Sequence, residues 1–274
     1  MMLVKRTFGI FLVCAAVGIA GDAFGGAQHE YQVRFDALWN PIDHSTFPVS
    51  AHFSPLVGAS HGAGFDIWSP GEVASLGVER VAEIGSASVL IGVINAAVSD
   101  GDAATRIAGS APSTPDVVLT NTFMVDDAHP LVSLITMVAP THDWFVGIDS
   151  LDVRDNEGQF RSEIVIDLPV WDAGTEPGSN FSTSGTAVEG GVIHLLPNAA
   201  AIFGGSAPIA RMTLTRLTPL TGDLNDDGVV DTADLGLLIA FFGTNNPAAD
   251  INGDSIVDTA DLGLLIANFG ASDS

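Results

Sequence analysis

The sequence predicts a mainly β protein, with a β-sandwich followed by a small α-helical domain at the C-terminus. Two observations predict this fold class. Short runs rich in β-branched and aromatic residues alternate with Gly, Pro, Asn and Asp over most of the chain, which is typical of sandwich strands and their turns. Near the C-terminus, one segment occurs twice and ends each time in helical apolar spacing.

The composition indicates a folded, strongly acidic protein. Hydrophobic residues make up 47% of the 274 residues and charged residues 15%, so the chain can fill a core and is not an acidic disordered tail. Asp and Glu number 33 against 9 Lys and Arg, which gives a formal charge of −24. Nucleic-acid binding depends on cationic side chains that neutralise phosphate, so we expect no nucleic-acid partner.

Residues 1–27 have the pattern of a secretory signal peptide. Two positive charges precede an uncharged, mostly apolar stretch of 14 residues at Thr7–Ala20, and small residues at 25–27 offer a cleavage site. A retained membrane anchor is the less favoured alternative, because a membrane span needs about 20 residues. Cys14, the only cysteine, lies in this segment. We therefore expect a secreted protein, extracellular, at the cell surface or in the periplasm, with no disulfide and no transmembrane anchor after cleavage.

The expected order of segments follows from the signal, the strands and the repeat. The boundaries are 1–27 for the signal peptide, 28–217 for the sandwich, 218–221 for a linker and 222–274 for the helical domain. Within the sandwich, strands are predicted at Tyr31–Phe35, Leu131–Val138, Ile164–Ile166, Gly191–Leu196 and Ala210–Leu217. Helical periodicity is expected only around Glu72–Ala82.

The C-terminal domain contains a duplication. Asp223–Gly243 recurs 27 residues later as Asp250–Gly270, with 16 of 21 positions identical. In each copy, apolar residues at i, i+3, i+4 and i+7 predict one helix. These residues are Leu235, Leu238, Ile239 and Phe242 in the first copy and Leu262, Leu265, Ile266 and Phe269 in the second. Asp231 and Asp234 can cap the first helix, and we expect the two helices to pack on each other.

Each copy begins with oxygen ligands at the spacing of a calcium-binding loop, in which alternate residues face one ion. The predicted ligands are Asp223, Asn225, Asp227, the Val229 carbonyl, Asp231 and Asp234 in the first loop, and Asp250, Asn252, Asp254, the Ile256 carbonyl, Asp258 and Asp261 in the second. Ca²⁺ takes about six to eight oxygens and tolerates such a mixed set. The pattern therefore predicts two Ca²⁺ ions that supply much of the folding free energy. A solvated acidic tail with chance spacing is the alternative.

A calcium loop followed by one helix, and then duplicated, resembles the type I dockerin module of cellulosomal proteins. This resemblance implies calcium-dependent folding and docking onto a cohesin-type receptor through helix residues just after each loop, here Thr232-Ala233 and Thr259-Ala260. Ser255 stands where the first loop has Gly228. Because Ser costs more than Gly at positive φ, we expect the second loop to bind Ca²⁺ more weakly.

Two segments of the sandwich carry acids that can lie close together. Asp143 belongs to the segment Pro140–Gly147, and Asp172 and Glu176 are four residues apart on a loop rich in Gly and Pro. Loops at one end of a sandwich can bring three such carboxylates to one place. Taken alone, each segment is typical of a surface turn.

The motifs around these acids resemble the spondin N-terminal domain of F-spondin and mindin. They occur in the family's order at His52–His61, Ile67–Ser75, Ala82–Gly85, His129–Ser133, Asp143–Asp149 and Trp171–Thr175. The resemblance implies a β-sandwich related to calcium-dependent membrane-binding domains, with one Ca²⁺ held by Asp143, Asp172 and Glu176. Glu176 is one methylene longer than the family's usual Asp, His142 replaces a familiar proline, and the family's cysteines are missing.

The sequence favours an interaction protein over an enzyme. Gly58–Gly62 satisfies the G-x-S-x-G motif around Ser60, but that motif needs a following helix, and the next residues predict none. We therefore expect no catalytic residue, and a secreted calcium-binding adhesion or interaction protein. Its expected partner is a cohesin-like, cell-surface or matrix protein, or a glycan. The alternative is a secreted hydrolase delivered to a polysaccharide-degrading complex by its dockerin.

Overall fold

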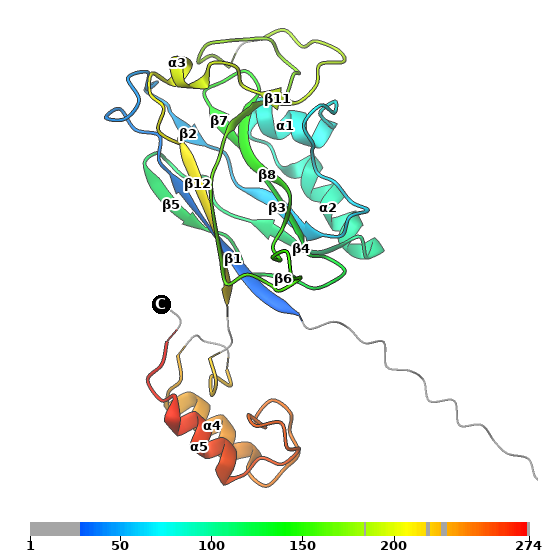
Figure 1. Ribbon diagram of the computed structural model, residues 1–274, viewed down its shortest axis with the longest axis vertical. Helices are drawn as coiled ribbons and strands as arrows, with labels where there is room; N and C mark the ends of the chain where they lie inside the picture. Colours follow the sequence, from blue (N-terminus) through cyan, green and yellow to red (C-terminus); the bar gives the residue numbers. More distant parts are fainter. Residues whose placement is uncertain (1–27, 184, 218–219, 226–228, 273–274) are drawn as a thin grey trace, which may run out of the picture.

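The computed structural model describes residues 28–183, 185–217, 220–225 and 229–272 (Figure 1). The predicted signal peptide, 1–27, therefore lies outside the described residues, as do residues 218–219 of the predicted linker. Within the described ranges, no helix is both long enough and apolar enough to cross a membrane.

Two antiparallel sheets form the larger, β-rich part of the chain, as predicted. The first sheet has the order β5-β1-β12-β9, with β6 also pairing β1. Its strands are β1 (His29–Ala37), β5 (Asp116–Leu119), β6 (Phe123–Val125), β9 (Glu163–Asp167) and β12 (Ala210–Leu217). The second sheet has the order β11-β10-β8-β7-β3-β4, with β2 also pairing β7. Its strands are β2 (His52–Phe53), β3 (Val57–His61), β4 (Ala103–Ala108), β7 (Leu131–Ala139), β8 (Trp144–Asp152), β10 (Val170–Asp172) and β11 (His194–Leu195).

The inner faces of the two sheets share one core. Alternation along β1 turns Tyr31, Val33 and Phe35 inward, where they meet residues such as Leu134 and Trp144 of the second sheet. The opposite face of β1 stays polar, because residues in a strand alternate between the two sides. This alternation is the pattern that predicts β1 from the sequence, whereas β5 and β6 of the same sheet are not predicted.

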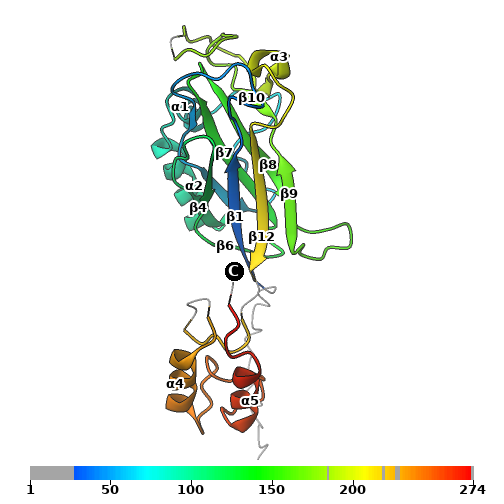
Figure 2. The ribbon, with the colours of Figure 1, turned by 90° about the vertical axis from the view of Figure 1, so that its left-hand side faces the viewer.

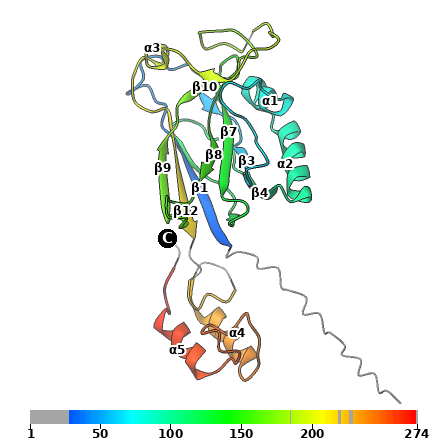
Figure 3. The same ribbon diagram turned by 45° about the vertical axis from the view of Figure 1, so that its right-hand side comes forward.

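Two helices cover the outer face of the second sheet, which is therefore buried on both sides (Figure 3). They are α1 (Leu76–Ile84) and α2 (Ser88–Asp100). Val81 and Ile94 of these helices pack against Ile135 and Phe145 of the sheet. A sheet covered on both faces reads as a continuous apolar run, and every residue of β7 after the first is buried.

Three expectations about the larger domain need correction. The helix predicted around Glu72–Ala82 is displaced to Leu76–Ile84, where Ser75 caps it, and the strand predicted at Gly191–Leu196 shrinks to His194–Leu195. Helix α2 was not predicted, and neither was α3 (Ala199–Phe203). The run Ser88–Asp100 is rich in Val and Ile on every side, so it showed no helical stripe.

The C-terminal helices α4 (Thr232–Phe241) and α5 (Thr259–Ala267) pack side by side, as predicted (Figure 2). Their core consists of Val230, Leu238, Ala249, Val257 and Leu265. The predicted capping box is present in α4. The Asp231 side chain accepts a backbone N–H of the first turn, and the Asp234 side chain accepts the backbone N–H of Asp231. The same box recurs in α5.

The predicted apolar stripe is only half correct. Leu238 and Leu265 are buried, but Ile239 is 61% exposed and Ile266 is 58% exposed. The reason is that the buried Asp234 occupies the inward position of the first turn, so the inward row runs through residue 238 rather than 239. Phe242 and Phe269 are exposed as well. Each helix therefore keeps an apolar outer face.

The shared core predicts a sharp difference between two adjacent leucines of α5. Leu265→Ala removes a fully buried side chain and is expected to cost about 2–5 kcal/mol, which is comparable to the whole stability of so small a domain. Leu264 is 37% exposed, so Leu264→Ala serves as the matched control. Far-ultraviolet circular dichroism of the full chain should show helix loss for Leu265→Ala alone. Equal loss in both variants would contradict this core.

Candidate metal sites

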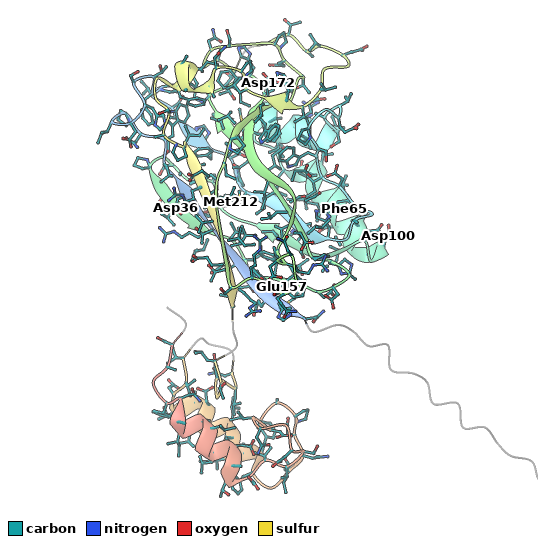
Figure 4. The ribbon with its side chains drawn as sticks, in the orientation of Figure 1. Asp36, Phe65, Asp100, Glu157, Asp172 and Met212 are labelled. Atoms are coloured by element: carbon teal, nitrogen blue, oxygen red, sulfur yellow. The ribbon has the colours of Figure 1, made fainter. Side chains whose placement is uncertain are left out.

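Sheet pairing brings two of the predicted ligands of the sandwich together. Asp143 lies in the turn between β7 and β8, and Asp172 ends β10. Strand β10 pairs with β8 so that Asp172 is opposite Trp144, the residue after Asp143. Both acids therefore lie at one end of the sandwich, the end opposite Glu157 (Figure 4). We call Asp143, Asp172 and Glu176 the loop-end site.

Asp143 is fully buried and uses only one of its two oxygens. Its Oδ2 accepts the backbone N–H groups of Thr175 and Glu176 at 2.8 and 2.9 Å, and the Thr175 hydroxyl at 3.3 Å. Its Oδ1 is buried without a hydrogen-bond partner. Burial raises the pKa of Asp143, the Glu176 N–H opposes this, and the negative charge of Asp172 raises the pKa further. A cation at Oδ1 would relieve both the burial and the repulsion.

Asp172 and Glu176 contribute differently to the loop-end site. Asp172 is 8% exposed, and its Oδ1 accepts the backbone N–H of Gly174 at 2.8 Å, which holds the start of the loop in a tight turn. The Glu176 carboxylate turns toward His142, with Oε2 3.9 Å from Nδ1. Among the described residues, no three His, Cys, Asp or Glu side chains are already gathered as a metal-binding group. The set of three carboxylates therefore stays a prediction, which the unpartnered Asp143 Oδ1 fits.

The structure adds one acid that sequence reasoning missed. Glu83 of α1 lies near the Thr175 side chain and feels the negative charges of Glu79 and Glu176. Burial is the main cause that raises the pKa of Glu83, and the polar side chain of Thr175 lowers it. No spacing in the sequence connects Glu83 with a loop almost a hundred residues later. Helix α1 thus adds negative potential to the loop-end site.

A shallow groove of about 420 Å³ opens beside the loop-end site. It is lined by Asp172, Gly174, Glu176, Pro177, Gly178, Val188, Gly191, Val192 and His194. Two of the predicted ligands thus form part of its wall, together with apolar side chains and glycines. A ligand in this groove would meet both carboxylate and apolar surface.

The second loop of the C-terminal domain folds around its first acid. Asp250 Oδ1 accepts the N–H groups of Gly253 and Asp254, and its Oδ2 accepts that of Ser255 at 2.7 Å. The Asn252 and Asp254 side chains in turn accept backbone N–H groups within the same loop. The chain is therefore wound tightly around these oxygens.

The last acid of each loop is fully buried and braces the loop from inside. Asp261 Oδ1 accepts the N–H groups of Ile251 and Asn252 at 2.8 and 3.0 Å, and its Oδ2 accepts that of Asp258 at 2.8 Å. Asp234 does the same for the first loop. Burial acts to raise the pKa of both acids, but the donated N–H groups outweigh it and the pKa of each is lowered. Both carboxylates are thus kept ionised, as ligands of Ca²⁺ must be.

The remaining predicted ligands can be placed only in part. Asp231 and Asp258 are the N-caps of α4 and α5. Asp223, Asn225 and Val229 are described and engaged in interactions. Asp227 lies outside the described residues. The twelve-ligand set therefore remains a prediction, supported in the second loop by the inward-facing oxygens.

Ser255 adopts the positive φ expected for its loop position, 74°. This conformation costs a residue other than Gly about 1–2 kcal/mol. Ser255→Gly should therefore stabilise the second loop by about 1 kcal/mol and tighten its Ca²⁺ binding about fivefold. Calorimetric titration of the full chain with Ca²⁺ measures this.

Gly253, in the same loop at φ 74°, gives a matched control of opposite sign. Gly253→Ala should weaken Ca²⁺ binding by a similar factor, because Ala then carries the strain. If neither substitution changed the affinity, backbone strain would not limit this site.

Comparison with known families places both parts of the chain. Residues 29–192 match the Spondin_N family, and residues 221–270 match the dockerin type I domain. Spondin-2 of Homo sapiens is 32% identical over 232 residues, which cover 75% of this chain and 69% of that protein. Spondin-1 of Rattus norvegicus is 30% identical over 178 residues, covering 63% of this chain and 21% of that protein.

One solved structure resembles the C-terminal domain in sequence. The type II cohesin-dockerin domain from Bacteroides cellolosolvens is 38% identical, and the match covers 21% of this chain and 97% of that one. Its TM-score of 0.21 carries no structural argument. The Spondin_N match alone spans more than half of the chain, which establishes the family. The chain belongs to the Spondin_N family and carries a type I dockerin domain behind its spondin domain.

Proposed function

We propose that this protein is a secreted, calcium-binding interaction protein without catalytic activity. Its spondin domain binds a target through loops that an ion orders, and its dockerin attaches it to a cohesin-type receptor. The observation that carries the proposal is the buried, unpartnered Oδ1 of Asp143 beside Asp172, in a spondin domain joined to a dockerin. Bound Ca²⁺ would supply a fixed positive charge at the loop-end site, with one ion there and two in the dockerin.

The loop-end site fits this role because its loops already depend on the acids that would hold the ion. The backbone of Thr175 and Glu176 is tied to Asp143, so the loop after β10 follows the position of that carboxylate. The groove beside it is lined by residues of the same loop. An ion that fixes Asp143 and Asp172 would therefore fix the wall of the groove, and a target would find it preformed.

The dockerin fits attachment because its outer helix faces are apolar and uncharged. Ile239 on α4 and Ile266 on α5 are exposed, and so are Phe242 and Phe269, which follow the ends of these helices at equivalent positions of the two repeats. The expected docking residues at 232–233 and 259–260 are exposed on the same two helices. A relative of this module, 38% identical in sequence, is a cohesin-dockerin domain, and a cohesin is the type of partner we infer.

The absence of catalysis is supported by the surroundings of Ser60. Its side chain is fully buried in the middle of the second sheet, where Oγ donates to the Met124 carbonyl at 2.6 Å and accepts the Thr105 N–H. Strand β3 leads into a turn, not into the helix that a nucleophile elbow requires. Turnover of a glycan or ester that Ser60→Ala abolished in a folded protein would contradict this part of the proposal.

Calorimetric titration of the mature chain with Ca²⁺ tests the calcium sites. Asp143→Asn should abolish binding at the loop-end site while the dockerin ions still bind, and Asp261→Asn should do the reverse, because each removes one charged ligand. Asp100→Asn is the matched control, since Asp100 is exposed at the far end of α2 (Figure 4). Binding no tighter than millimolar in the unsubstituted chain would refute the proposal.

Binding of the full chain to a purified type I cohesin, with and without chelator, tests the attachment. The double variant Ile239→Asp and Ile266→Asp places a charge on each helix face, where bound cohesin would bury it. It should therefore weaken binding at least about a hundredfold. Val165→Asp, on the exposed face of β9, is the control and should leave the affinity unchanged. Equal binding in chelator would show that docking does not need calcium.

A further inference from the structure

His142 has an unusual position beside the loop-end site. Its side chain is only 6% exposed, and it precedes the buried Asp143 in the chain. Its Nε2 lies 3.0 Å from the amide oxygen of Asn180. Because that oxygen can only accept, Nε2 carries the proton and Nδ1 keeps a free lone pair. Nδ1 is buried and has no hydrogen-bond partner.

A carboxylate oxygen of Glu176 lies close to this lone pair. Glu176 Oε2 lies 3.9 Å from His142 Nδ1, which is too long for a hydrogen bond. Two ligand atoms of one tetrahedral Zn²⁺ ion lie about 3.4 Å apart, given N–Zn and O–Zn bonds of about 2.0–2.1 Å. A closure of roughly 0.5 Å would bring both atoms onto one cation, whereas a shared proton would need a larger shift.

Two glycines leave room for this arrangement. A Cβ on Gly185 would lie 2.3 Å from Glu176 Oε2 and 2.8 Å from His142 Nδ1, so any side chain at this position would intrude on both atoms. A Cβ on Gly178 would lie 2.0 Å from the imidazole ring. The ring is therefore held closely on one side, and the space next to its lone pair is free of side chain on the other.

We propose that His142 Nδ1 and Glu176 Oε2 are ligands of one cation at the loop-end site, so that this site binds Zn²⁺ as well as Ca²⁺. The inference rests on the proposed function, because it assigns a further ligand to the same ion site. Calcium prefers oxygen alone, whereas imidazole nitrogen suits zinc and similar metals. The hydrogen bond from Nε2 to Asn180 is the arrangement that orients most metal-binding histidines. Asp143 Oδ1, in the adjacent residue, is also buried without a hydrogen-bond partner, and a shift of the loop toward it would add a third ligand atom.

Titration of the full chain with Zn²⁺ and, separately, with Ca²⁺ tests the proposal. His142→Gln should weaken Zn²⁺ binding at least about tenfold, and Asn180→Ala should weaken it by a comparable factor because the ring loses its orientation. Neither should change Ca²⁺ affinity by more than about threefold, since oxygen ligands hold that ion. Co²⁺ in place of Zn²⁺ gives a second readout, because its visible absorption changes when a nitrogen ligand is lost.

Two further variants make the result specific. Gly185→Ala keeps every ligand but fills the space between them, and it should weaken Zn²⁺ binding as much as His142→Gln. His29→Gln is the control, because His29 packs against Phe160 at the start of β1 and should not affect either metal. Circular dichroism establishes that each variant is folded.

The outcomes separate this inference from the proposed function. Ca²⁺ binding that needs Asp143, with no Zn²⁺ binding or with Zn²⁺ binding that His142→Gln leaves intact, would overturn the role of His142 alone. Failure of both metals to bind at the loop-end site would overturn both proposals. Weaker Zn²⁺ binding in His142→Gln and Gly185→Ala, with Ca²⁺ binding intact, is the supporting result.

Discussion

A single buried carboxylate joins two loops of the larger domain and fixes the geometry of its loop-end site. Asp143 lies in the turn between β7 and β8, and its Oδ2 holds the backbone of Thr175 and Glu176 after β10. Burying a carboxylate is costly unless N–H donors or a cation compensate for the lost water. Here one oxygen is satisfied by the loop and the other is left open. The same group thus fixes the loop and creates a demand for positive charge.

The dockerin uses the same physical device in a more complete form. Asp234 and Asp261 are fully buried, yet donated N–H groups lower the pKa of each. At Asp143 the balance goes the other way, because burial and the negative charge of Asp172 outweigh the donated hydrogen bonds and leave the pKa raised. The dockerin loops are therefore already organised around ionised acids, whereas the loop-end site still carries uncompensated repulsion.

Local patterns explain why part of the structure could be predicted from the sequence. Strands β1 and β12 alternate visibly, and the capping Asp of each dockerin helix stands at a fixed offset from its partner acid. Helix α2 could not be recognised, because Val and Ile surround it and the sheet beneath decides its form. The turn of Glu176 toward His142 and the approach of Glu83 depend on tertiary packing, which no spacing records.

Helix α1 connects the loop-end site to the layer behind the sheet. Glu83 lies near the Thr175 side chain, and Val81 of the same helix is packed in the core that includes α2. Thr175 also donates to Asp143, so a displacement of this threonine is felt by the helix and by the carboxylate alike. Ion binding at the loop-end site would therefore reach helix α1, and the amide protons of that helix would report on it.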